Sequence, residues 1–99
     1  MNNDYIKEFC GIPQNVNVYD TQISNNKKMA IARLQVANVS TDETNELVKD
    51  YVATFCRIRM VTEPSNVFIN SENARLRDII VLLTYGRATE WYLLKFLLS

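Results

Sequence analysis

The sequence predicts a single α+β domain over residues 1–99, with an N-terminal β-hairpin, a long central helix and two C-terminal helices packed on a small sheet. Three observations favour this fold class. Apolar and polar residues alternate before residue 36, apolar residues recur at helical spacing after residue 46, and they dominate the last fifth of the chain. An all-α bundle, in which residues 27–39 are helical, is the alternative.

The first elements are a short helix and a hairpin. Asp4–Cys10 is expected to be helical and to end at Gly11, because glycine is favoured just after a helix and Pro13 cannot continue one. Alternation over residues 16–36 predicts the hairpin, with a polar turn at residues 24–27. Residues 27–39 include good helix formers. Their apolar members scatter around a helical wheel, however, which favours the strand.

The central helix is predicted over residues 41–57. Ser40 and Glu43 have the spacing of a capping box at its start. Asp42, Glu46 and Asp50 recur every four residues and would share one face of this helix. The simpler interpretation is a solvated face whose acids suit the helix dipole. The alternative is a patch that binds a divalent metal or a basic partner.

The C-terminal part is predicted to contain a turn at residues 63–66, a short strand at 66–70 and two helices. Ser71 would cap the first helix, which runs to Tyr85 and stops at Gly86, and Thr89 would cap a second helix over residues 90–98. The segment after residue 78 lacks the wide polar face of a surface helix, so another part of the chain or another molecule must cover it. Its longest unbroken apolar run, residues 79–83, is far short of the roughly 20 residues of a membrane span.

The composition argues against an enzyme and against a metal or other cofactor. The chain has no histidine, which removes the commonest general base and metal ligand. Cys10 and Cys56 alone cannot form the usual zinc sites, and two isolated glycines exclude phosphate-binding and dinucleotide-binding loops. An enzyme that uses Cys56 or the acidic helix face is the least favoured alternative.

The overall charge and the N-terminus bear on partners and location. The formal net charge of zero argues against a general polyanion binder, which carries a basic excess, and it opposes self-association little. The first residues include acids and no apolar stretch of the secretory type, so we expect a cytoplasmic protein. The many asparagines are typical of an AT-rich genome, such as that of a virus or mobile element, in which case the location is the host cytoplasm.

These observations predict a non-enzymatic protein-binding module, a small regulatory or inhibitor protein that forms a homodimer through its apolar C-terminal helices. The aromatic and leucine residues expected at that interface are Tyr85, Trp91, Tyr92, Leu94, Phe96 and Leu98. The alternative is a nucleic-acid-binding protein, or one with an acidic protein partner, that uses a basic surface. The residues of that surface would be Lys27, Lys28, Arg57, Arg59, Arg75, Arg77 and Arg87. Solvation or pairing within the chain is the simpler interpretation of this basic set.

Overall fold

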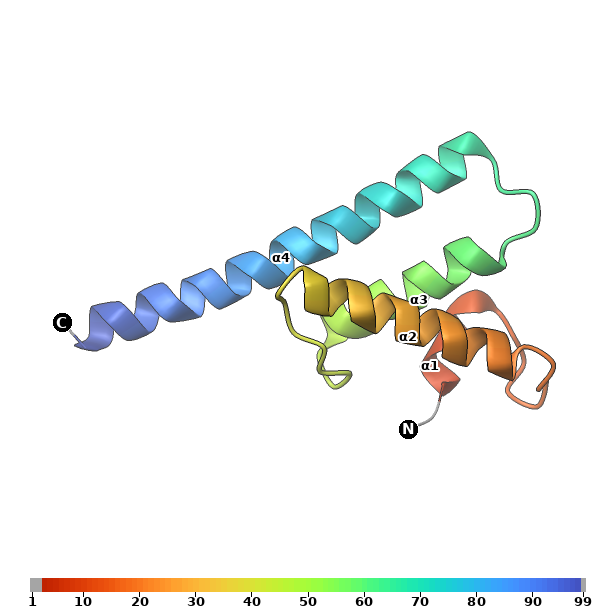
Figure 1. The fold of residues 1–99 in the computed structure, drawn as a ribbon, viewed down its shortest axis with the longest axis horizontal. Helices are drawn as coiled ribbons and strands as arrows, with labels where there is room; N and C mark the ends of the chain where they lie inside the picture. The colour runs from red at the N-terminus through yellow and green to blue at the C-terminus, as the bar shows by residue number, and fades with distance from the viewer. Residues whose placement is uncertain (1–2, 99) are drawn as a thin grey trace.

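In the computed structural model the chain forms four helices and no strand over residues 3–98, whose backbone the structure describes; side chains are described for residues 3–85. The helices are α1 (Asp4–Cys10), α2 (Asp20–Val36), α3 (Glu46–Met60) and α4 (Asn66–Leu98). Helix α3 lies in the middle and contacts each of the other three (Figure 1). The predicted α+β fold with a small sheet is therefore wrong, and the all-helical alternative describes the fold class.

The N-terminal helix confirms the sequence prediction. α1 ends at Cys10, and Gly11 follows with a left-handed backbone (φ 72°). The Gly11 N–H donates to the Glu8 carbonyl and the Ile12 N–H donates to the Lys7 carbonyl, which is the hydrogen-bond pattern of a Schellman motif. A residue with a Cβ would be strained at this φ, so glycine is required here for its backbone freedom.

Helix α2 replaces the predicted hairpin. Its buried residues are three or four positions apart, as on one face of a helix: Ile23, Asn26, Ala30 and Leu34. The pattern is hard to recognise because that face uses a polar Asn26 and a small Ala30, whereas the apolar Met29 and Val36 are exposed. The alternation that suggested a strand combined the buried Ala30 and Leu34 with the exposed Ala32 and Val36.

Asn38 ends α2. It adopts a left-handed backbone (φ 59°), donates its N–H to the Gln35 carbonyl, and is followed by Val39, whose N–H donates to the Leu34 carbonyl. This is a second Schellman motif, and asparagine is the residue after glycine that best tolerates such a φ. Leu34 and Val39 are both buried, which adds the apolar contact that accompanies the motif.

Helix α3 begins at Glu46, five residues later than predicted, because the expected capping residues form local turns instead. The Ser40 Oγ accepts from the Asp42 N–H, and the Asp42 Oδ1 accepts from the Thr44 N–H. Such side-chain bonds to nearby backbone compete with helix formation. The true cap is Asn45, whose Oδ1 accepts from the Leu47 N–H at 2.8 Å.

The core is built around α3. Residues 51–56 are all buried, so this helix is covered on every side rather than along one stripe. The neighbouring helices each contribute side chains to this core: Ile6 from α1, Ile23 and Leu34 from α2, and Leu76, Ile79 and Leu83 from α4. Thr54 is the buried polar residue of this stretch, and it donates to the Asp50 carboxylate one turn earlier.

Helix α4 is one continuous helix of 33 residues, so the predicted strand at 66–70 and the division into two helices are wrong. Its start is set by Ser65, not by Ser71, because the Ser65 Oγ accepts from the Phe68 N–H. The helix also continues through Gly86 and past Thr89. A glycine inside a helix costs only about 1 kcal/mol relative to alanine, which the helix-forming residues on both sides outweigh.

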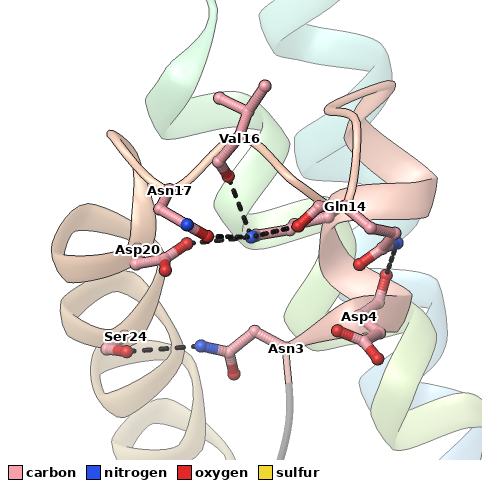
Figure 2. Close-up of polar contacts among 8 residues, drawn as sticks. Asn3, Asp4, Gln14, Val16, Asn17, Asp20 and Ser24 are labelled. Carbon is pink, nitrogen blue, oxygen red and sulfur yellow. Dashed lines mark hydrogen bonds and ion pairs between the residues drawn. The ribbon is translucent and has the colours of Figure 1, made fainter.

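Lys7 of α1 ties the loop between α1 and α2 to both helices, and Figure 2 labels its partners Gln14, Val16, Asn17 and Asp20. Its side chain is 8% exposed, and its ammonium donates to the carbonyls of Gln14 (3.2 Å) and Val16 (2.9 Å). The same group pairs with the Asp20 carboxylate at 3.0 Å in the first turn of α2. The ammonium also donates to the Asn17 side-chain oxygen at 3.5 Å, so its bonds hold the path of a loop that lacks regular structure.

Candidate interaction surface on α4

Helix α4 is much longer than the helix on which it packs. At 1.5 Å per residue, the 33 residues of α4 extend about 50 Å and the 15 residues of α3 about 22 Å. Figure 1 shows α4 running back along α3 and continuing past the other helices to the C-terminus. More than half of α4 therefore cannot pack along α3, whatever its side chains are.

The face of α4 that packs on α3 is short. Leu76, Ile79 and Leu83 are buried and follow each other at intervals of three and four residues. The same register continues with Gly86 and Glu90, which offer no large apolar side chain. The apolar seam toward α3 is thus interrupted after Leu83, and in the sequence the same register becomes apolar again only at Leu93 and Leu97.

A second apolar face lies on the opposite side of α4. Val81 is 48% exposed, Leu82 54% and Tyr85 68%, and these three residues form what we call the outer patch. A rotation of about 100° per residue puts Val81 and Tyr85 opposite Leu83 and its buried neighbours and puts Leu82 about 90° from them, at the edge of the outer patch. Of the predicted interface residues only Tyr85 belongs to the outer patch. Val81 and Leu82 were missed, although their one-turn spacing to Tyr85 could have identified them.

The remaining predicted interface residues lie on the helical backbone of α4, but their side chains are outside the described residues: Trp91, Tyr92, Leu94, Phe96 and Leu98. Helical register relates some of them to the outer patch. Tyr92 is two turns after Tyr85, and Phe96 is one turn further, so these positions return to the same side of the helix.

Two predicted nucleic-acid contacts, Arg57 and Arg75, form ties between helices. Arg57 pairs with the Glu72 carboxylate, joining α3 to α4, and its guanidinium lies 4.4 Å from the centre of the Phe9 ring of α1. Arg75 pairs with Asp50 at 2.9 Å. Both arginines therefore form salt bridges with acidic residues on a neighbouring helix. The Phe9 ring also makes a cation–π contact with Arg57.

The other predicted basic contacts are dispersed. Lys27 pairs with Glu43 at 2.8 Å, and Arg59 donates to the Asn26 side-chain oxygen at 3.0 Å. Lys28 and Arg77 are exposed, and they lie on different helices. The side chain of Arg87 is outside the described residues. Of the described members of this set, Arg57 and Arg75 come together over the Phe9 ring, at 4.4 and 5.6 Å from its centre.

Glu43 has a structural role that the capping-box hypothesis did not foresee. Its carboxylate accepts from the Tyr5 hydroxyl at 2.8 Å in addition to its pairing with Lys27. Burial, followed by the bond to Glu43, raises the pKa of Tyr5 above its ordinary value. The loop before α3 is thereby fastened to both α1 and α2.

The predicted acidic face does not form. Asp42 lies in the turn before α3, where two bonds from Thr44 lower the pKa of its carboxyl, while Asp50 is engaged with Arg75 and Thr54. Glu46 remains exposed at the start of α3. Across the described part of the chain, no three acidic or cysteine side chains come together in a way that would hold a metal ion.

The two thiols are held in their protonated form. Burial raises the pKa of Cys10, an effect that the nearby Arg57 partly offsets, and it raises the pKa of Cys56 to about 12. A protonated thiol is a poor nucleophile. Cys10 borders a hollow of about 370 Å³ beside Arg57 and Met60, but the lining of this hollow contributes no carboxylate that could act as a base.

Comparison with protein-family models, with curated proteins and with solved structures finds no match for this chain. Within the described residues, each helix is too short or too polar to cross a lipid bilayer.

Proposed function

We propose that this protein is a non-enzymatic protein-binding module that associates with a second copy of itself through α4. The observation that carries the proposal is the outer patch of Val81, Leu82 and Tyr85, three large apolar side chains that are about half or more exposed on the same helix that packs on α3. A regulatory or inhibitory role suits a small module of this kind, because its activity would be the binding itself.

The energetics favour a partner for α4. An isolated helical extension gains little stability from its own hydrogen bonds, and most helices in proteins are held by packing of an apolar face. Burying apolar surface yields about 25 cal/mol for each Å² removed from water. A second copy offers a matching helix with the same apolar face, and the net charge of zero opposes their approach little.

The proposal is tested by measuring the molar mass of the purified protein with size-exclusion chromatography and light scattering, from low to high micromolar concentration. We expect a dimer that the Leu82→Asp variant converts to a monomer, because an aspartate would be buried without a partner in the interface. The wild-type protein as a strict monomer at high micromolar concentration would contradict the proposal.

Val67→Asp is the matched control for this experiment. Val67 lies on the same helix and is 76% exposed, but it belongs to the first turn, far from the outer patch. An aspartate there suits the N-terminal end of a helix. We therefore expect Val67→Asp to remain dimeric, with a circular dichroism spectrum like that of Leu82→Asp and of the wild type. If both variants dissociated equally, the outer patch would not be the interface.

A further inference from the structure

We infer that the two copies pair their α4 helices in antiparallel orientation, so that residues 86–98 of each copy, which we call the distal segment, cover the outer patch of the other. This inference rests on the proposed self-association and adds its geometry. It starts from the observation that α4 carries the exposed outer patch and a long distal segment on one continuous helix.

The register of α4 provides a seam for such a pair. Positions separated alternately by four and three residues lie along one side of a helix, as in a coiled coil. The seam that contains Leu82 and Tyr85 runs through Asp78, Leu82, Tyr85, Thr89, Tyr92 and Phe96. It is symmetric about residue 87. An antiparallel pair centred there therefore sets position 82 level with 92, 85 level with 89 and 78 level with 96 of the other copy.

Charge distinguishes the two orientations. Asp78 is exposed at one end of the seam, and Lys95 adjoins its other end in the helical register. The antiparallel pair brings Asp78 of one copy beside position 95 of the other, where lysine is the complementary charge. A parallel pair would instead set the two Asp78 carboxylates against each other, and like charges in that position repel.

Spin labels read the orientation directly. A nitroxide is attached through Asn73→Cys, an exposed position of α4, in a Cys10→Ser background that leaves only the buried Cys56. Position 73 is 14 residues from the centre of the pair, so the antiparallel arrangement separates the two labels by about 40 Å. A parallel pair keeps them within about 20 Å. A pulsed electron paramagnetic resonance distance near the longer value is expected, and the shorter value would overturn the inference.

A charge exchange provides an independent measurement. Asp78→Lys and Lys95→Asp should each weaken dimerisation by about 3- to 10-fold, since each places like charges together. The double variant restores opposite charges and should return the dissociation constant to within about 3-fold of wild type. A double variant weaker than either single variant would contradict the antiparallel pair. A wild-type monomer would overturn the self-association itself, whereas a dimer with a short label distance would overturn only the orientation.

Discussion

At the scale of single residues, the clearest energetic feature is Lys7, a buried lysine that the loop surrounds. Lysine is seldom buried unless its ammonium is paired and hydrogen-bonded. Here the chain supplies two backbone carbonyls and the Asp20 carboxylate (Figure 2). The carbonyls of an irregular loop have no hydrogen-bond partners from a helix or sheet. The lysine therefore satisfies backbone groups that would otherwise need water.

Lys7→Met should lower the free energy of unfolding by about 1–3 kcal/mol, since methionine keeps the apolar stem but leaves these acceptors without their donor. Urea denaturation followed by circular dichroism measures the change. The control is Lys28→Met on an exposed face of α2, which should stay within about 0.5 kcal/mol of wild type. Equal effects of the two substitutions would show that the bonds of Lys7 contribute nothing beyond those of an exposed lysine.

Cys56 predicts a fall in stability at alkaline pH. Its folded pKa is raised by burial from 9.0 to about 12, so between these values the unfolded thiol loses its proton while the folded thiol keeps it. The free energy of unfolding must therefore decrease as pH rises through that window, and the full contribution is present below about pH 9.

Cys56→Ala removes this titration. Its stability should decline less steeply than that of the wild type between about pH 8 and about pH 10.5, as measured by urea midpoints across the window. Tyr5 and Tyr51, whose pKa values burial also raises, leave a residual slope in the variant. Parallel pH profiles of the two proteins would contradict the assignment.

At the scale of elements, the start of α3 provides a test between two caps. Asn45→Ala should destabilise the protein by about 1 kcal/mol, because it removes the side-chain acceptor for the Leu47 N–H. Ser40→Ala, the cap expected from sequence, should cost less, since Ser40 only closes an exposed turn. Chemical denaturation of both variants decides, and a larger loss in Ser40→Ala would restore the capping-box interpretation.

The elements differ in how far sequence could define them. α1 was predicted with its bounds, because Gly11 favours the end of a helix and Pro13 cannot continue one. The helix predicted from the spacing of apolar residues matches α3 over most of its length. Its start, however, depends on which groups the Glu43 carboxylate bonds. That group could reach back along a helix or outward to Tyr5 and Lys27, and only the folded chain brings those two partners near.

Helix α2 shows a different reason why a sequence pattern can fail to identify a helix. A polar residue on its buried face, Asn26, receives a bond from Arg59 of α3, a residue far away in sequence. Without that partner, burying an amide is unfavourable, so a pattern analysis assigns Asn26 to the surface. The signal for the end of α2 was nevertheless present locally, in an asparagine that tolerates a left-handed backbone before a buried valine.

At the scale of the whole molecule, α4 extends beyond α3, and the distal segment is the part of α4 that a second copy is expected to cover. Substitutions in this segment test that expectation. Tyr92→Ala and Phe96→Asp should dissociate the dimer, because the antiparallel seam places these two positions of the distal segment between the copies. Light scattering measures the mass and circular dichroism measures the helix content. A soluble oligomer of unchanged mass and stability in both variants would count against the distal segment as an interface.

The structure bears differently on the predicted basic surface and on the predicted interface of the C-terminal helices. Arg57, Arg75 and Lys27 are engaged with acids on neighbouring elements, so their positions serve the packing of the helices. Binding to nucleic acid remains a prediction. The tail prediction gained Val81 and Leu82, whose exposure depends on which side of α4 meets α3.

The sequence by itself determined the helical nature of α1 and α3, the absence of histidine, and an excess of apolar residues after residue 78. Local rules suffice for these features, because they depend on neighbouring residues and on composition. The tertiary structure decided that residues 20–36 are helical and that Val81, Leu82 and Tyr85 face outward. The physical reason is that burial and ion pairing join residues distant in the chain, and these energies outweigh local preferences of about 1 kcal/mol.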